Sequence, residues 1–305
     1  MTDHPIITEA LRRYARQRRA DRRTSQNYNI SQMFTCARKE YLYRLLGNSP
    51  ETTGVGERKL VPLPADDGSL FKMDTGVINE EFRVTPALDS IEAEEPFSEP
   101  PVQVYLFIPE YGYSGKIDRI VGLPDDPHPV EFKFTQAESF RYALKEQNKW
   151  IRDGYLLQIL TYYWFRHYIV SDYWRDRLTN CKKCRLYVSA MDRQLEQEVL
   201  VYPDERRLIY WETTGSMVET RLPEQFTKEI IESWMRQMKQ YWEDRKLPPL
   251  LSGDDKYPCE YRTGYCPFVP FCFGRIPGKV YKGTMPITKD EYTLMLKGER
   301  NESQG

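Results

Sequence analysis

The sequence lacks a long apolar run and an excess of charge of either sign, and each absence narrows the classes of protein to consider. Lys and Arg total 44 and Asp and Glu total 45, so the net charge of −1 gives no general attraction to a polyanion. No apolar run approaches the roughly 20 residues that span a bilayer, and the amino terminus lacks the apolar stretch of a secretory signal. We therefore expect a globular, cytoplasmic protein with no membrane partner, in which any affinity for nucleic acid comes from local patches.

Histidine is also scarce, which limits the ligands that could bind a metal together with the six cysteines. In a reducing cytoplasm such a set is more often a metal site than a disulfide framework. None of the three histidines lies near the last three cysteines, so a metal held there would be bound by thiolates alone. The cysteines are Cys36, Cys181, Cys184, Cys259, Cys266 and Cys272.

Two of these cysteines form a separate pair in NCKKC. Cys181 and Cys184 are interpreted as incidental cysteines at the start of a strand, with Lys182 and Lys183 solvated. A zinc half-site or a redox pair are the alternatives.

Cationic residues are concentrated near the amino terminus. Residues 11–23 hold seven arginines against one aspartate, and four of them repeat at spacings of four, three and four on one helical face. These are Arg12, Arg16, Arg19 and Arg23. We predict a basic helical arm over residues 1–30, which is either a solvated helix or a stripe that binds DNA phosphates without regard to sequence.

Apolar patterning predicts alternating helices and strands. Ser31 is a plausible N-cap of a helix that ends at Gly47, residues 48–68 indicate a loop, and a further helix is expected over 75–84. Runs at 102–108, 113–123 and 130–134, separated by turn sequences, predict an antiparallel meander.

Downstream of this meander the same patterning predicts mostly helix with three more strands. A long helical stretch is expected over about 137–170, followed by a buried strand at 185–191 and a hairpin of 197–202 and 207–213. A helix then runs from about 223 to 245. Its predicted apolar face consists of Phe226, Ile230, Trp234 and Met238.

Three charged residues stand out within the predicted meander. Glu131 and Lys133 lie on one face of a strand with a period of two, and Asp118 can join them from the neighbouring strand. Such a site offers two carboxylate ligands to Mg²⁺ or Mn²⁺ with an ammonium alongside, which phosphodiester hydrolysis requires. A solvated sheet face with a cross-strand ion pair is the alternative, but the flanking Val130, Phe132 and Phe134 make it less satisfactory.

SGKIDRI followed by VEFKF resembles motifs two and three of the PD-(D/E)xK nucleases. Gln158 and Tyr162, one helical turn apart, resemble the Gln-x3-Tyr motif of the RecB-like branch. The resemblance implies that Asp118, Glu131 and Lys133 are catalytic and that Gln158 and Tyr162 help to position a DNA end.

The chain departs from that family at its first motif. The RecB-like branch usually offers a metal-binding histidine there, whereas TGVINEEF has Asn79. Asn79 or Glu80 is the expected source of a further oxygen ligand.

The segment SQMFTCARKEYLYRLLG resembles the amino-terminal cysteine segment of iron-sulfur RecB-like nucleases, which include AddB-type subunits and the CRISPR-associated exonuclease family. In that family one amino-terminal and three carboxy-terminal cysteines hold a [4Fe-4S] cluster. The resemblance assigns Cys36, Cys259, Cys266 and Cys272 to this role, with a structural zinc site as the alternative because the Cys259-x6-Cys266 gap is longer than usual.

Taken together, the expected fold is a restriction-endonuclease-like α/β core with a mixed sheet flanked by helices, plus an α-helical iron-sulfur lobe formed by both chain ends. Residues 1–30 are expected to form the basic arm and residues 65–220 the nuclease core. The iron-sulfur lobe is expected to consist of residues 31–64 and 221–280, and residues 281–305 form a tail. The expected activity is Mg²⁺- or Mn²⁺-dependent hydrolysis of DNA, exonucleolytic on single-stranded or frayed ends, in recombination, repair or CRISPR adaptation with partners from those processes. A catalytically weakened DNA-binding module is the alternative.

Overall fold

The structure is a computed structural model that describes residues 27–34, 36–45, 53–55, 58–60, 97–122, 126–135, 137–145, 154–190, 195–211, 216–250, 268 and 272. The chain divides into two compact units. One contains the described residues within 1–28, 35–74 and 240–305, and the other those within 29–34 and 75–239. Within the described ranges, no helix has the length and apolar character needed to cross a membrane.

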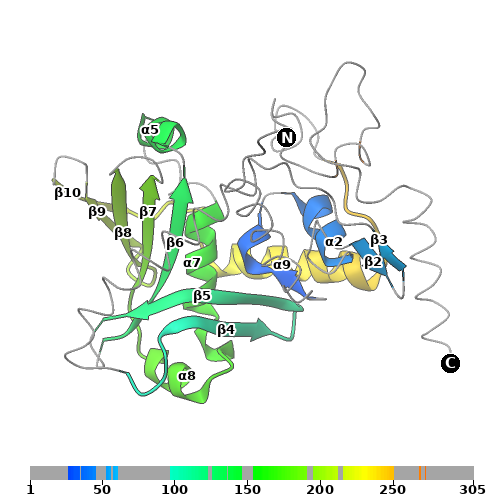
Figure 1. Cartoon of the computed structure of the whole chain (residues 1–305), viewed down its shortest axis with the longest axis horizontal. Helices are drawn as coiled ribbons and strands as arrows, with labels where there is room; N and C mark the ends of the chain where they lie inside the picture. The colour runs from blue at the N-terminus through cyan, green and yellow to red at the C-terminus, as the bar shows by residue number, and fades with distance from the viewer. Residues whose placement is uncertain are drawn as a thin grey trace, which may run out of the picture. The chain divides into compact units, whose positions relative to one another are not determined.

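An eight-stranded mixed sheet organises the larger unit, in the order β1-β5-β6-β7-β8-β9-β10 with β4 beside β5 (Figure 1). β6 and β7 are parallel, whereas β4–β5, β5–β6, β7–β8, β8–β9 and β9–β10 are antiparallel. The strands are β1 (Tyr28–Asn29), β4 (Val102–Ile108), β5 (Tyr113–Val121), β6 (His128–Thr135), β7 (Cys184–Ala190), β8 (Glu196–Tyr202), β9 (Arg207–Trp211) and β10 (Met217–Arg221).

The predicted meander, the strand that follows it and the hairpin are confirmed as β4–β5–β6, β7 and β8–β9. β10 was not predicted because MVETR is mostly exposed and has no apolar alternation that would distinguish it from a loop. Residues 48–68, predicted as a loop, contain the hairpin β2 (Thr53–Val55) and β3 (Arg58–Leu60). The helix predicted over 75–84 lies outside the described residues.

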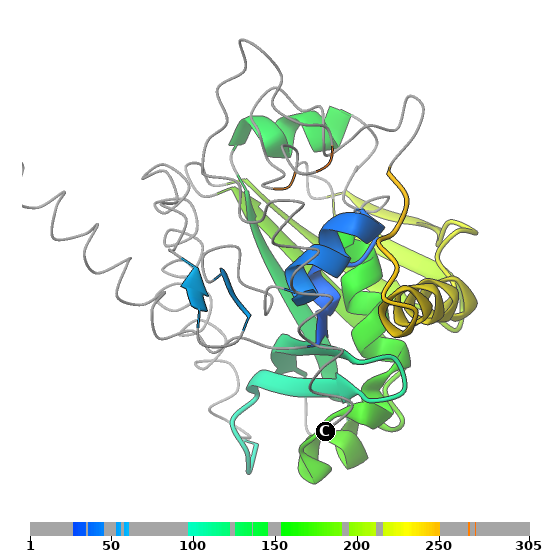
Figure 2. The ribbon, with the colours of Figure 1, turned by 90° about the vertical axis from the view of Figure 1, so that its right-hand side faces the viewer.

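Helices flank this sheet. α7 packs against β6 and β7, and both views place α5 and α8 at opposite ends of the unit (Figures 1 and 2). The helices are α2 (Ala37–Leu45), α5 (Ala137–Lys145), α7 (Gly154–Trp164), α8 (Asp172–Leu178) and α9 (Lys228–Glu243), with 3-10 turns η1 (Ile30–Gln32) and η3 (Arg166–Tyr168). The fold is therefore α/β with a mixed sheet, as the sequence predicted.

The prediction that Ser31 caps a helix is wrong. Asn29 is the cap, because its side-chain oxygen accepts hydrogen bonds from the Ser31 N–H at 3.0 Å and from Ser31 Oγ at 2.9 Å. Phe34 then adopts a left-handed φ of 66°, which no helix interior contains, so the chain breaks before α2. α2 begins only at Ala37, and the predicted end at Gly47 lies outside the described residues.

The long helix predicted over 137–170 ends earlier, at Trp164. Arg166 turns back at this point and donates to the carbonyls of Tyr163 at 2.6 Å and Leu178 at 2.8 Å. Ser171 caps a separate helix, α8, with its hydroxyl accepting from the Trp174 N–H at 3.3 Å. These side-chain bonds satisfy backbone groups that a continuous helix would have paired internally.

The predicted apolar face of the last helix is partly wrong. α9 starts at Lys228 because residues 223–226 form a turn closed by the Phe226 N–H and the Pro223 carbonyl. The buried positions are Ile231, Met235 and Met238, whereas Ile230 is 42% exposed.

Candidate active site

The candidate site forms where β5 and β6 move apart. The two strands are paired at Val121–His128, Ile120–Pro129 and Arg119–Val130. Beyond that point β5 continues along β4 while β6 continues along β7, and the two run in different directions in Figure 1. Backbone groups of β5 and β6 that face this opening need partners other than each other.

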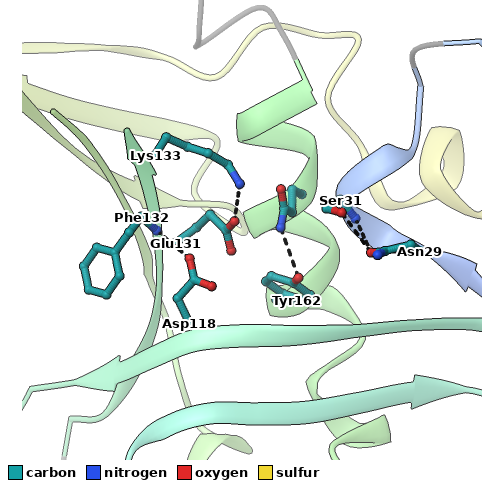
Figure 3. Close-up of polar contacts among 8 residues, drawn as sticks. Asn29, Ser31, Asp118, Glu131, Phe132, Lys133 and Tyr162 are labelled. Atoms are coloured by element: carbon teal, nitrogen blue, oxygen red, sulfur yellow. Dashed lines mark hydrogen bonds and ion pairs between the residues drawn. The ribbon is translucent and has the colours of Figure 1, made fainter. Parts of the chain in front are cut away.

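Asp118 and Glu131 occupy facing positions one step beyond the last paired residues. The Phe132 N–H donates to Asp118 Oδ2 at 2.8 Å, so the carboxylate takes the place of a strand partner. The Asp118 and Glu131 carboxyl groups lie close enough for Glu131 to affect the pKa of Asp118, and Glu131 is only 2% exposed. Figure 3 shows the two side chains pointing toward one another. The strand separation thus brings two carboxyl groups together in a largely buried place.

Lys133 completes this cluster from the same strand face as Glu131, as the period of two predicted. Its ammonium donates to Glu131 Oε1, and its side chain is 19% exposed (Figure 3). The ammonium also lies 5.4 Å from the centroid of the Tyr155 ring. Lys133 therefore connects the buried carboxyl pair to the more open side of the site.

The electrostatics of the cluster favour a cation between the carboxyl groups. Burial raises the pKa of Asp118 above its ordinary value, although Lys133, the Phe132 amide and Glu131 act in the opposite direction. Burial alone would lower the pKa of Lys133, but the Glu131 and Asp118 carboxylates raise it above its ordinary value. Two adjacent carboxylates are disfavoured when both are bare, so a proton or a metal cation is preferred between them.

Gln158 and Tyr162 line the site from α7. Gln158 Nε2 donates to the Tyr162 hydroxyl at 3.1 Å, and both side chains are buried. Burial, together with the charges of Glu131 and Asp118, raises the pKa of Tyr162 well above its ordinary value. This raised pKa keeps the hydroxyl protonated, and the Tyr162 ring lies close against β5 at Gly115.

Gly115 permits this contact. A Cβ at this position would lie 2.9 Å from Tyr162 Cε1, 3.0 Å from its hydroxyl and 3.1 Å from Ile30 Cδ1. Because real Cβ atoms do not approach so closely, any larger residue would displace the tyrosine or the strand. This role was not predicted from the sequence, although a glycine inside a strand often marks such a close backbone approach.

Tyr155 was also not singled out from the sequence. It lies three residues before Gln158 and seven before Tyr162, a spacing that puts all three on one helix face. This spacing was the available signal. Tyr155 is 37% exposed, unlike the two buried residues that follow it on that face.

Two of the four cysteines assigned to a cluster are described, and both belong to the smaller unit. Cys36 is buried immediately before α2, and its carbonyl accepts from the Glu40 N–H at 3.0 Å. The Cys272 N–H donates to the Phe268 carbonyl at 2.9 Å, and the Phe268 ring packs edge-on against Tyr43 of α2 with centroids 5.0 Å apart. The chain segments that carry these two thiols therefore pack together.

The Cys181–Cys184 pair lies at the start of β7, as predicted, and both thiols are buried. Burial raises the pKa of Cys181 to about 11 and that of Cys184 well above its ordinary value. Lys183 is not solvated as expected: it forms an ion pair with Asp126 and is 19% exposed. Protonated, buried thiols are poor metal ligands and nucleophiles, which supports a structural role.

Several predicted site residues lie outside the described residues. They are Arg12, Arg16, Arg19, Arg23, Asn79, Glu80, Cys259 and Cys266. Among the residues that the structure does describe, no group of three or more His, Cys, Asp and Glu side chains is arranged to hold a metal ion. Asp118 and Glu131 form a pair of candidate ligands, and the predicted third ligand is one of those not described.

Comparison with known proteins leaves the chain without a family assignment. No family model and no curated protein matches the sequence. One solved structure, described as "Crystal structure of SSO0001", is similar over 92% of this chain and 100% of that chain, with 12% sequence identity and a TM-score of 0.42. At that TM-score the similarity carries no argument about function.

Proposed function

We propose that this chain is a metal-dependent DNA nuclease of the PD-(D/E)xK type with a restriction-endonuclease-like core. The observation that carries the proposal is the meeting of Asp118, Glu131 and Lys133 where β5 and β6 separate. A solvated sheet face does not account for it, because Glu131 is 2% exposed and the carboxyl groups contact each other. Buried charges of this kind concentrate at functional sites.

The donor set fits a hard divalent cation. Asp118 and Glu131 provide carboxylate oxygens, which Mg²⁺ and Mn²⁺ prefer, and a cation held by both would offset the repulsion between two adjacent carboxylates. A bound Mg²⁺ or Mn²⁺ polarises a phosphate oxygen and lowers the pKa of a coordinated water. Asn79 or Glu80 would supply a further oxygen ligand.

Each remaining residue has a distinct task in hydrolysis. The Phe132 amide fixes the orientation of Asp118 through the 2.8 Å hydrogen bond. The raised pKa of Lys133 keeps its ammonium charged, so it can offset negative charge that develops on the phosphate. Gln158 and Tyr162 hold α7 against β5 and keep the site closed on that side, where they help to position the DNA end.

The proposed substrate is a single-stranded or frayed DNA end, cut exonucleolytically. The basic stripe of Arg12, Arg16, Arg19 and Arg23 would add phosphate contacts that do not depend on sequence. Protein partners from recombination, repair or CRISPR adaptation are the corresponding proposal for the cellular role.

Digestion of end-labelled DNA tests the activity. The purified chain is incubated with single-stranded and duplex oligonucleotides in Mg²⁺, in Mn²⁺ and in EDTA, beside Lys133→Ala and the matched variant Lys182→Ala, which removes an exposed lysine away from the site. We expect metal-dependent products from the native chain and from Lys182→Ala, and a loss of at least about 100-fold in Lys133→Ala. Equal products from all three proteins would refute the assignment.

Asn79 motivates the alternative of a DNA-binding module that has lost catalysis, since it stands where the RecB-like nucleases that the chain resembles usually have a histidine. The same digestion separates the two, because the module would bind the oligonucleotides without producing any cleavage. An Asn79→His variant sharpens the comparison: an active nuclease should gain affinity for Mn²⁺, whereas an inert module should remain inactive.

We also propose that Cys36, Cys259, Cys266 and Cys272 hold a [4Fe-4S] cluster in a lobe formed by both chain ends. Support comes from the packing of Phe268 on Tyr43, which holds the Cys272 segment against the helix that follows Cys36. Four thiolates leave no open position, so the metal would be structural. Zinc in the same ligand set is the alternative.

Anaerobic purification tests this assignment. A brown protein with broad visible absorption and about four iron atoms per chain supports the cluster, and Cys36→Ser should lose that colour while Cys181→Ser keeps it. A colourless protein that contains zinc would refute the iron-sulfur assignment and favour the alternative.

A further inference from the structure

Tyr155 differs from the residues that follow it on α7 because its side chain is exposed. The residues from Leu156 to Tyr163 are buried, so they account for the packing of the helix against the sheet. Tyr155 in the first turn is 37% exposed, and its ring centroid lies 5.4 Å from the Lys133 ammonium. The ring therefore forms part of the open side of the site rather than part of the core.

The contact with Lys133 does not by itself require an aromatic ring. Lys133 already donates to Glu131, and an exposed cation–π contact contributes only about 0.5–1 kcal/mol. A tyrosine at this point instead offers a flat apolar surface directly beside the ammonium that would meet the scissile phosphate. Aromatic rings placed beside phosphate-binding cations are the usual means of holding unpaired bases.

We propose that Tyr155 stacks on the unpaired nucleobase next to the scissile phosphate, and that this contact selects single-stranded or frayed DNA ends. The inference rests on the proposed nuclease function and names the feature of its substrate that is recognised. A base inside a duplex is already stacked and paired, so it would have to leave the helix before it could reach the ring. An unpaired end has no such requirement.

The exposed face of α5 offers further groups that an unpaired DNA strand could contact. α5 starts at Ala137, two residues after β6 ends, so it continues from the strand that carries Glu131 and Lys133 (Figure 1). It buries Phe140 and Ala143, whereas Arg141, Tyr142 and Lys145 are exposed. Two cations and a second ring on one short helix can contact the phosphates and bases that follow the cut site.

The test compares oligonucleotides that differ only in the base to be stacked. Steady-state cleavage is measured on a single strand with normal end nucleotides and on the same strand with abasic residues at the end, for the native chain, Tyr155→Phe, Tyr155→Leu and the control Trp211→Leu. Trp211 on β9 is also 37% exposed, so it controls for the loss of an exposed aromatic ring.

We expect removal of the end bases to raise the KM of the native chain about tenfold, since stacking of one base on an aromatic ring is worth a factor of about 5 to 150. Tyr155→Leu should show the raised KM on both substrates, with kcat nearly unchanged. Tyr155→Phe and Trp211→Leu should behave as the native chain does.

Two results would overturn the inference while leaving the nuclease proposal intact. One is an equal effect of base removal in the native chain and Tyr155→Leu. The other is a fall in kcat without a change in KM in Tyr155→Leu, which would make the ring a support for Lys133 only. If the native chain cuts neither substrate in Mg²⁺ or Mn²⁺, the nuclease proposal itself has failed, and that outcome is distinct from the other two.

Discussion

Replacing Asp118 with asparagine should stabilise the metal-free protein while abolishing its response to metal. Asparagine keeps an oxygen in place to accept from the Phe132 N–H, now 2.8 Å from Asp118 Oδ2. Its amide can also donate to Glu131, which the aspartate contacts. The substitution therefore keeps the local hydrogen bonds and removes one of two adjacent negative charges.

The size of the effect follows from these contacts. A hydrogen bond from the new amide to the Glu131 carboxylate contributes about 1.5–3 kcal/mol, and the lost attraction between Asp118 and Lys133 removes part of it. We expect a net gain of about 1 kcal/mol in the free energy of unfolding without metal, or roughly 2 °C in Tm. With Mg²⁺ at ten times its Kd the native chain should gain about 1.4 kcal/mol, whereas Asp118→Asn should gain nothing. The order of stability therefore reverses when metal is added.

The stability that Asp118→Asn gains over the native chain should decrease as the pH falls. Because burial raises the pKa of Asp118, the folded state takes up a proton at a higher pH than the unfolded chain does. The destabilising effect of the carboxylate is thus fully present above the folded-state pKa and is relieved as the pH falls through it. The difference between Asp118→Asn and the native chain should shrink accordingly.

Chemical denaturation in EDTA and in Mg²⁺, at pH 7.5 and pH 5, measures all of these quantities. Asp176→Asn, on the exposed surface of α8, is the matched control and should change neither stability nor metal response. A destabilised Asp118→Asn protein that still gains stability from Mg²⁺ would contradict both the charge argument and the assignment of Asp118 as a ligand.

Three further predictions concern the sheet and the substrate surface. Burial lowers the pKa of His128 from 6.5 to about 4, with Arg185 and Lys183 nearby adding to the effect, so the folded state excludes a proton that the unfolded chain binds. The free energy of unfolding should fall by up to roughly 3 kcal/mol as the pH drops from 6.5 to 4. Denaturation of His128→Gln at several pH values should lack this decrease, and a dependence of stability on pH equal to that of the native chain would refute the prediction. Gly115→Ala should destabilise the protein by about 1–3 kcal/mol through the clash with Tyr162 and lower kcat, and a variant with native stability in thermal melts would show that β5 can move aside. Replacing both exposed cations of α5 with glutamine should weaken the salt dependence of single-strand binding, measured by fluorescence anisotropy. The slope of log Kd against log salt should fall by about 1.4, and an unchanged slope would show that α5 does not contact the DNA phosphates.

The sequence predicted the sheet that holds the site better than the helices around it. Strands β4 to β9 follow from apolar runs between strong turn sequences, which are local signals. The helix boundaries depended on contacts between residues distant in the sequence, such as Arg166 with the Leu178 carbonyl, and on the left-handed Phe34. No periodicity reveals these contacts before the chain is folded.

For the site, the spacing of Glu131 and Lys133 was sufficient to place them on one strand face, but the approach of Asp118 was not determined by spacing alone. It required β5 and β6 to separate after Arg119–Val130, which depends on β4 and β7 competing for the two strands. The close approach at Gly115 and the position of Tyr155 beside Lys133 were not predicted for the same reason, since each depends on where α7 packs. Residue types and order therefore indicated the candidate residues, and tertiary packing determined their surroundings.

The amide that Asp118 holds could report on the site in solution. The Phe132 N–H lies where β5 no longer accompanies β6, so its protection against hydrogen–deuterium exchange depends on a carboxylate side chain rather than on a strand. Its nitrogen-15 chemical shift should respond to protonation of that carboxylate and to occupancy by a cation before any change appears in neighbouring strands. A single backbone resonance would then follow the protonation and metal occupancy of the site.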